Sequence, residues 1–348
     1  MEGSISLDLA RGGTPDGATA PEGATPFREA TAQRRQEMKR FCPATRAARV
    51  GTVLVALISL CLGGAEAAFA SDGVLEINQA CAVQTGCFPG DPPGIPVQIT
   101  TTGSYRLTSN LTPPNQNTTV ISISAAGVSV DLNGFAIQGA NTTFPCSSPG
   151  SGIGVTSSAS AVALSNGNIR GMGFAGVELS ISNNARVERV IVEQNCGNGI
   201  AVGSGSLVTD SVARNNSGHG IMLNPTSRVS GSVATSNLGN GIFGPTGYVS
   251  VEGCVANSNS TSGISSPSAA SLVTDSMASN NTSYGISVST GSLVLRSSTN
   301  GNGVNGVEMT NGSSGMGFIT ANGNPFGAVS GFVVQVACSV LGGLVSCP

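Results

Sequence analysis

The stretch NCGNGI at residues 195–200 returns as NSGHGI at residues 216–221 and as NLGNGI at residues 237–242. Its leading asparagine keeps one place in a period of 21–22 residues, and a glycine followed by an apolar residue closes each copy. The glycine–apolar pair continues upstream at residues 176–177 and 154–155. The six periodic asparagines are Asn195, Asn216, Asn237, Asn259, Asn281 and Asn302.

A repeat of this length is typical of a solenoid, in which each unit buries its apolar face only against its neighbours. Short segments rich in Val, Ser and Thr lie between the turns, for example SLVT at residues 206–209 and again at 271–274. Glycine or asparagine interrupts them every few residues, which excludes helices and favours strands. The sequence therefore predicts coils of three short parallel strands, stacked from about residue 152 to residue 331.

Stacking places each side chain about 4.8 Å from its counterpart in the next coil. An inward asparagine at one corner can then bond amide to amide along the axis, so that its buried polar groups are satisfied by each other. We expect the six periodic asparagines to form such a ladder.

These residues resemble right-handed parallel β-helix proteins of the pectin-lyase-like superfamily. The Asn-x-x-x-Gly-Ile pattern carries the resemblance, and VSVDLNGFAI at residues 128–137 is similar to the early coil that opens many of these proteins. The resemblance implies an all-β solenoid. It implies no single activity, because the superfamily includes lyases, hydrolases, esterases, epimerases, phage spikes and proteins without known chemistry.

The charge of the chain argues against a nucleic-acid partner. From Ser71 onward there are 11 acidic residues, seven arginines and no lysine, so the net charge is 7 − 11 = −4. Phosphate binding needs a basic surface, which this composition does not provide.

The N-terminus has the pattern of an export signal. Residues 38–70 contain basic residues, an apolar run and the small-x-small sequence Ala68-Phe69-Ala70, which predicts a signal peptide. Residues 1–37 are expected to be a disordered or mis-assigned extension. The apolar run is too short to span a bilayer, so no stable membrane span is expected after cleavage. The predicted location is secreted, periplasmic or cell-surface.

The period is absent at both ends of the exported part. Prolines cluster between residues 71 and 119, which predicts an N-terminal cap over the open edge of the coils. Residues 120–331 are expected to form the β-helix, and residues 332–348 a C-terminal cap.

Seven cysteines follow the predicted cleavage site, and an exported chain permits disulfides. We expect Cys81 to pair with Cys87 and Cys338 with Cys347, because each pair is close in sequence at an end that needs a cap. The number is odd, so at least one thiol stays free; Cys254 is the candidate for a buried one. The pairing of Cys146, Cys196 and Cys254 is left open. No CxxC spacing occurs and the chain has a single histidine, so no metal or other cofactor is expected.

His219 is a weak catalytic candidate. Gly218-His219-Gly220-Ile221 is similar to a Gly-His-Gly-Ile stretch of polygalacturonases, which also place paired aspartates on nearby coils. Here the preceding coil, QNCGNG at residues 194–199, has no carboxylate. Asparagine, serine and tyrosine replace the histidine in other coils, which indicates a variable, solvent-exposed turn.

Asp131 is the other weak candidate, although turn hydrogen bonding is its expected role. Glu178 and Glu308 face outward but should lie six coils apart, about 29 Å, whereas glycoside hydrolysis needs roughly 5–10 Å. They therefore cannot act as a pair.

Other charges recur with opposite sign one coil away, which predicts axial ion pairs of low individual strength. The predicted pairs are Arg189 with Asp210, Glu193 with Arg214, and Asp275 with Arg296.

Two functions of different classes are compatible with these residues. The first is an exported, non-catalytic surface, adhesion or glycan-contacting scaffold, whose partner would be a polysaccharide or a cell-surface glycan. The second is a polysaccharide-active lyase, epimerase or hydrolase, which would need a cleft with three or more converging ionisable groups. The scarcity of uncommitted charges favours the first, with the question of enzymatic activity left open. The oligomeric state is not indicated.

Overall fold

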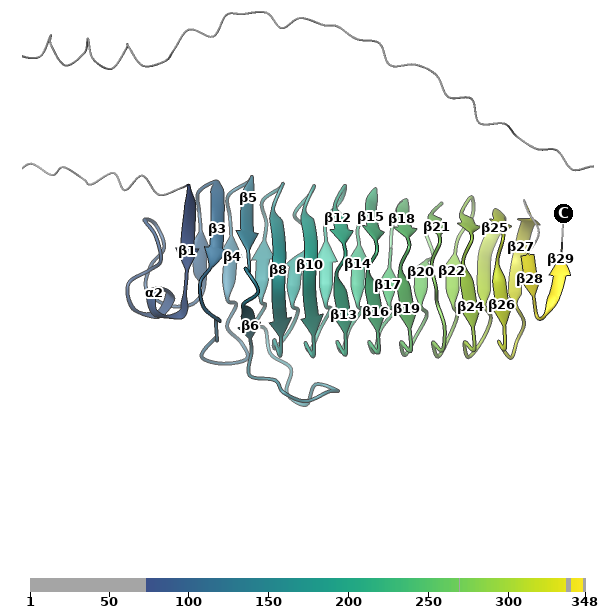
Figure 1. Cartoon of the computed structure of the whole chain (residues 1–348), viewed down its shortest axis with the longest axis horizontal. Helices are drawn as coiled ribbons and strands as arrows, with labels where there is room; N and C mark the ends of the chain where they lie inside the picture. Colours follow the sequence, from purple (N-terminus) through teal and green to yellow (C-terminus); the bar gives the residue numbers. More distant parts are fainter. Residues whose placement is uncertain (1–72, 269, 336–338, 347–348) are drawn as a thin grey trace, which may run out of the picture. The chain divides into compact units, whose positions relative to one another are not determined.

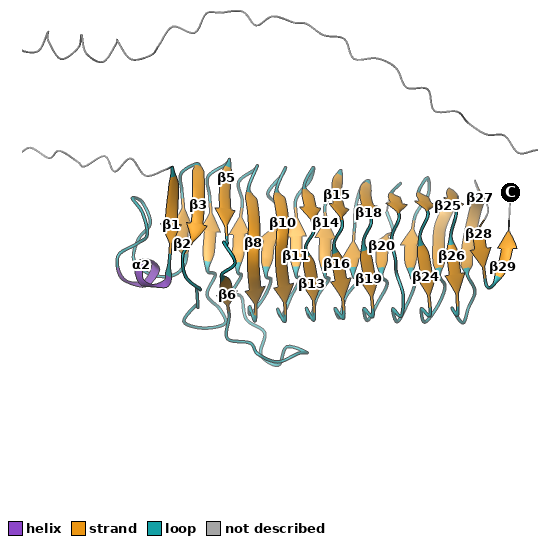
Figure 2. Ribbon diagram, viewed as in Figure 1, coloured by secondary structure: helices purple, strands orange, loops and turns teal. Residues whose placement is uncertain are grey.

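The computed structural model describes residues 73–268, 270–335 and 339–346. Strands joined by tight turns stack along one axis from β1 to β29, as Figures 1 and 2 show. Almost every strand pairs in parallel with its equivalent one coil later. The predicted all-β parallel solenoid is confirmed. The predicted extension, residues 1–37, and the predicted signal peptide, residues 38–70, lie outside the described residues.

Three stacks of strands, here called faces A, B and C, form the sides of the coils. Face A contains β1 (Val74–Ile77), β3 (Gly103–Leu107), β5 (Val128–Asp131), β12 (Leu207–Thr209), β15 (Ser227–Ser230), β18 (Val249–Glu252), β21 (Leu272–Thr274) and β23 (Leu293–Leu295). Face B contains β6 (Ala136–Gln138), β13 (Val212–Arg214), β16 (Val233–Thr235), β19 (Val255–Asn257), β24 (Ser298–Asn300), β26 (Thr320–Asn322) and β28 (Ser339–Leu341). Face C contains β2 (Val97–Ile99), β4 (Ile121–Ile123), β7 (Val155–Ser157), β9 (Val177–Leu179), β11 (Ile200–Val202), β14 (Ile221–Leu223), β17 (Ile242–Phe243), β20 (Ile264–Ser266) and β22 (Ile286–Val288).

Four longer strands run from one face into the next. The strands β8 (Ala163–Arg170) and β10 (Arg186–Glu193) join faces A and B, and β25 (Val307–Gly317) and β27 (Val329–Gln335) join faces C and A. At the corner between faces A and B the backbone adopts positive φ in successive coils, for example 59° at Asn166 and 48° at Asp210. Asparagine and aspartate tolerate this left-handed region better than most residues, so they recur at the corner.

The core is a set of aligned aliphatic columns. Ile200, Ile221, Ile242, Ile264 and Ile286 are paired in register and buried, each 0% or 1% exposed. Burying an aliphatic side chain contributes about 1.5–3 kcal/mol, so the columns supply most of the energy that holds the coils together.

The predicted asparagine ladder is confirmed. The side-chain Nδ2 of Asn195 donates to Oδ1 of Asn216 at 2.9 Å, and each later member repeats the bond at 3.0–3.1 Å as far as Asn324. The six predicted members are all buried, with at most 2% exposure. In each coil the same Oδ1 also accepts the backbone N–H of the preceding asparagine, as in Asn216 N to Asn237 Oδ1 at 3.0 Å.

Buried serines form two further columns. In the first, the backbone N–H of Ser211 donates to Oγ of Ser232 at 3.2 Å, and the pattern resumes between Ser276 and Ser297 at 3.3 Å. In the second, the N–H of Ser206 donates to Oγ of Ser227 at 3.1 Å. These hydroxyls accept backbone donors at corners that the strand ladders do not reach.

The N-terminal end differs from the predicted arrangement. The predicted cap spans residues 71–119, with the β-helix starting at residue 120, yet β1 already pairs with β3 and β3 with β5 in face A. The part outside the coils is the short helix α2 (Gln79–Gln84) with the loop after it. The Cys81–Cys87 disulfide, as predicted, closes this segment. Asp91 fixes the loop, because its carboxylate accepts the backbone N–H groups of Cys87 and Gln98.

At the other end, β28 continues face B and β29 (Leu344–Ser346) pairs with it in antiparallel fashion. These strands fall within the predicted C-terminal cap, residues 332–348. Cys338 and Cys347, the second predicted disulfide, lie outside the described residues. Among the residues described, no helix is long and apolar enough to cross a membrane.

Candidate functional site

His219 is not a solvent-exposed turn residue, contrary to the sequence-based expectation. Its Nδ1 accepts the backbone N–H of Asn240 at 2.9 Å, and its ring stacks on Phe243 with the centroids 4.4 Å apart. Burial lowers the pKa of His219. The reason is the column to which it belongs: Asn198 and Asn240 use Oδ1 to accept the next coil's backbone N–H, and the imidazole takes the same role.

Asp131 is engaged in the local structure. One carboxylate oxygen accepts the backbone N–H of Asn133 at 2.9 Å and the Nδ2 of Asn166 at 3.0 Å. The other lies 3.7 Å from the guanidinium of Arg106. The first contact is the predicted turn hydrogen bond, which allows the positive φ of Asn133.

Two of the three predicted axial ion pairs are present. Arg214 contacts Glu193 at 2.7 Å, and Arg296 contacts Asp275 at 2.7 Å. The third prediction is wrong, because Arg189 pairs with Glu188 instead of Asp210.

The backbone at Arg189 has φ of 52°, and its Nε donates to Oδ1 of Asn166 in the preceding coil at 2.8 Å. The corner conformation thus directs this arginine away from Asp210. Besides Arg189 with Glu188, three pairs were missed from the sequence: Arg106 with Asp131, Arg186 with Glu188, and Arg228 with Glu252.

Glu178 and Glu308 occupy the same outward position of face C, six register steps apart. At about 4.8 Å per step they are separated by about 29 Å, too far for joint acid–base chemistry. A hydrogen bond to Glu308, with burial and the nearby charge, raises the pKa of Tyr284. Within the described ranges no three His, Cys, Asp or Glu side chains come close enough to hold a metal ion.

One loop leaves the regular coil. Residues 139–152 follow β6, project from the side of the stack and run below β8 and β10 (Figure 1). A disulfide between Cys146 and Cys196, whose pairing the sequence left open, attaches the loop to the turn before β11. The backbone N–H of Cys146 also donates to Oγ of Ser217, one coil further on. Cys254, the predicted free thiol, is buried and unpaired.

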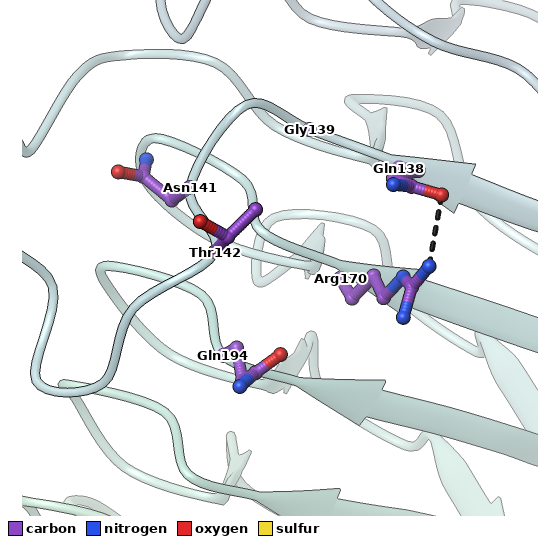
Figure 3. A pocket seen from close by; sticks show the side chains of 6 residues that line it. All are labelled: Gln138, Gly139, Asn141, Thr142, Arg170 and Gln194. Atoms are coloured by element: carbon purple, nitrogen blue, oxygen red, sulfur yellow. Dashed lines mark hydrogen bonds between the residues drawn. The ribbon is translucent and has the colours of Figure 1, made fainter.

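A pocket of about 190 Å³ lies between this loop and the ends of the face B strands. Its lining residues are Gln138, Gly139, Asn141, Thr142, Arg170 and Gln194. Figure 3 shows Gln138 and Arg170 together on one side, with Thr142 and Gln194 across from them. Arg170 Nη2 donates to Oε1 of Gln138 at 2.9 Å. Sequence reasoning missed this site; its only signal was a loop that breaks the period.

The pocket lies at the start of a line of outward side chains at the end of the face B strands, here called the polar row. Register pairing and two backbone-to-side-chain bonds connect its members from coil to coil. The polar row consists of Gln138, Arg170, Glu193, Arg214, Thr235, Asn257, Ser279, Asn300 and Asn322. Beyond Arg214 it is uncharged and composed of hydroxyl and amide groups.

A family model described as "Right handed beta helix region" matches residues 111–244. The fold of this chain is a right-handed parallel β-helix. No curated protein matches it in sequence.

Several solved structures are similar to this β-helix. The A-module of mannuronan C-5 epimerase AlgE4 of Azotobacter vinelandii has 12% identity and a TM-score of 0.46, covering 68% of this chain and 87% of that one. Pectate lyase Pel9A has 17% identity and a TM-score of 0.45, covering 76% and 78%. A mutant of the periplasmic alginate epimerase AlgG has 14% identity and a TM-score of 0.48, covering 69% and 70%.

Proposed function

We propose that this right-handed β-helix is an exported, non-catalytic scaffold that contacts a polysaccharide or cell-surface glycan along the polar row. The observation that carries the proposal is that five of its carboxylates contact arginine side chains. Those of Asp131, Glu188, Glu193, Glu252 and Asp275 each contact an arginine. A general acid or base needs a carboxylate that can approach substrate, and these are held by structural partners instead.

The polar row supports the glycan as partner. From Thr235 to Asn322 it presents neutral hydroxyl and amide groups, one in each coil, on half-buried or buried side chains. Such groups can donate to and accept from sugar hydroxyls. A polymer that lies along the axis would meet this pattern repeatedly, so weak contacts would add up.

Export is supported by the Cys81–Cys87 and Cys146–Cys196 disulfides, since such bonds persist in oxidising compartments.

A binding experiment tests the glycan contact. The purified protein is screened on a glycan array, and its strongest polymer is measured again with Thr235→Trp, which places a bulky ring in the middle of the polar row. Ser265→Trp is the matched control, because Ser265 faces outward from β20 on face C. We expect loss of binding in the first variant only. Equal binding by both variants would remove the polar row from the proposal.

The same experiment also tests the alternative function, a lyase, epimerase or hydrolase that acts on a polysaccharide. A chemically altered polymer recovered from the same incubation, with new reducing ends, unsaturated ends or a changed uronate composition, would favour that alternative.

A further inference from the structure

Arg170 differs from every other described arginine. Arg106, Arg186, Arg189, Arg214, Arg228 and Arg296 each lie within ion-pair distance of a carboxylate. Arg170 has no carboxylate partner in the part of the chain that the structure describes. Its side-chain bond there is the one from Nη2 to Gln138, and a guanidinium has five N–H donors. Most of its donor capacity is therefore available to a ligand.

The nearest candidate partner is already occupied. Glu193 is the register partner of Arg170 in the next coil. Its Oε2 accepts from Arg214 at 2.7 Å, and its Oε1 accepts from Asn168 at 3.3 Å. Both oxygens of Glu193 therefore have partners, Arg214 in the following coil and Asn168 in the coil of Arg170 itself, and neither oxygen pairs with Arg170.

The surroundings of Arg170 limit what can bind. The pocket of about 190 Å³ is smaller than the roughly 300–1,000 Å³ of ordinary small-molecule sites. Thr142 and Gln194 face Arg170 across it (Figure 3) and can donate from a hydroxyl and an amide. Asn141 also lines the pocket, with its Nδ2 buried and without a partner in the described residues. In Figure 3 its amide points away from Arg170, so it does not face a group bound there.

The charges of Arg170 and Glu193 favour a ligand with a single negative charge. One guanidinium balances one negative charge, and the carboxylate of Glu193 in the next coil disfavours a dianion such as phosphate. A planar carboxylate matches the guanidinium fork with two parallel N–H···O bonds. We propose that the pocket under the loop of residues 139–152 binds one carboxylate group through Arg170, with Thr142 and Gln194 as neutral donors.

This site goes beyond the glycan contact proposed above, because it can take a free carboxylate even if no polymer lies along the polar row. Two sources share the chemistry: a small free acid and an acidic sugar. Titration of the protein with acetate, with D-glucuronate and with glucose separates them. The resonances of the arginine Nε–Hε groups report binding directly.

We expect Arg170 to shift with glucuronate or acetate and not with glucose. Tighter binding of glucuronate would assign the site to an acidic sugar, and equal binding to a free acid. Arg170→Gln should weaken binding by about tenfold or more, since a hydrogen bond to a charged group is lost. Arg186→Gln removes an exposed arginine outside the pocket and should leave the affinity within about twofold.

A steric variant makes the test independent of the charge. Thr142→Trp should fill the pocket and abolish the shift, whereas Thr143→Trp, one residue further along the exposed loop and outside the pocket lining, should not. Glucose binding as well as glucuronate would overturn the proposal. So would carboxylate affinity that survives both Arg170→Gln and Thr142→Trp.

Discussion

The side-chain Nδ2 of Asn216 donates to Oδ1 of Asn237, 3.0 Å away and one coil further along the chain. The backbone N–H of Asn216 reaches the same oxygen at 3.0 Å. From Asn216 to Asn302, each ladder asparagine therefore accepts from two donors of the asparagine one coil earlier, while its own Nδ2 also donates to a backbone carbonyl. This double use explains why asparagine is kept at this corner, since no apolar residue offers an acceptor there.

Asn237→Ala should destabilise the protein by about 1–3 kcal/mol, because buried groups of Asn216 and Asn259 lose their partners. Urea unfolding followed by circular dichroism measures the change. Ser250→Ala, at an outward position of β18, is the control and should shift the midpoint little. Equal losses in the two variants would count against an energetically important ladder.

Cys254→Ser should leave stability unchanged or raise it by up to about 1 kcal/mol. Cys254 interrupts a column of serines: its own N–H donates to Oγ of Ser276 at 3.2 Å, and its thiol contacts the carbonyl of Glu252 at 3.3 Å. The side chain makes the second of these bonds, and a hydroxyl donates to a carbonyl better than a thiol does. Thermal unfolding of Cys254→Ser and Cys254→Ala checks this, and a serine variant less stable than the alanine variant would contradict it.

The thiol of Cys254 should not react in the native state at neutral pH, because burial raises its pKa to about 11. A thiol-specific reagent should label Cys254 only after the protein unfolds. Rapid labelling of the folded protein would contradict the buried position.

Acidification should destabilise the protein through His219. Burial lowers the pKa of its imidazole, so the folded state favours the neutral ring whose Nδ1 accepts from Asn240. The contribution of His219 is complete above the unfolded pKa of about 6.5 and is lost as the pH falls below that value toward the folded pKa. His219 is the single histidine of the chain, so its NMR titration is unambiguous.

His219→Asn provides the control, because asparagine occupies the same column at Asn198 and Asn240 and accepts the next N–H there. This variant should keep its stability and lose the acid-dependent step. A His219 pKa at or above about 6.5 would contradict the burial of the ring.

Arg214→Gln should cost more stability than Arg296→Gln. Glu193 has a side chain only 12% exposed, so the loss of Arg214 leaves a nearly buried carboxylate under-satisfied, at about 1–3 kcal/mol. Asp275 is 43% exposed and water can replace Arg296. Urea midpoints of the two variants give the comparison, and equal shifts would show that burial of Glu193 is unimportant.

The Arg296→Gln variant can also be tested through the titration of Asp275. The hydrogen bond from Arg296 lowers the pKa of Asp275, so the contribution of this carboxylate to stability is present above its unfolded pKa and disappears as the pH falls through the folded one. Arg296→Gln should raise the pKa of Asp275 toward its ordinary value. An unchanged NMR titration would contradict the pairing.

The sequence predicts the structural features that recur in successive coils. A period of 21–22 residues was sufficient to place Asn195 and its equivalents in an inward ladder and to pair Glu193 with Arg214, because both depend only on stacking. The serine columns, such as Ser211 above Ser232, have the same spacing and could have been found in the same way.

Departures from the repeat were not predictable by that reasoning. The pairing of Arg189 with Glu188 depends on a positive φ at a corner, which a column of residue types does not reveal. The ring of His219 is partly buried and stacks on Phe243, which belongs to the following coil but to another column. The pocket at Arg170 depends on a loop that leaves the regular coil and is attached to it by the Cys146–Cys196 disulfide. The contacts of this loop follow no period.

The central claim is that the charges of this β-helix hold its coils and do not catalyse. The most direct measurement incubates the purified protein with pectate, polygalacturonate and alginate, with and without calcium, and follows unsaturated products and reducing ends. Five carboxylates, those of Asp131, Glu188, Glu193, Glu252 and Asp275, contact arginines, and Glu178 and Glu308 lie about 29 Å apart. No product should therefore exceed that of an Asp131→Ala control. Product formed by the unsubstituted protein and lost in Asp131→Ala would contradict the account and make Asp131 a catalytic residue.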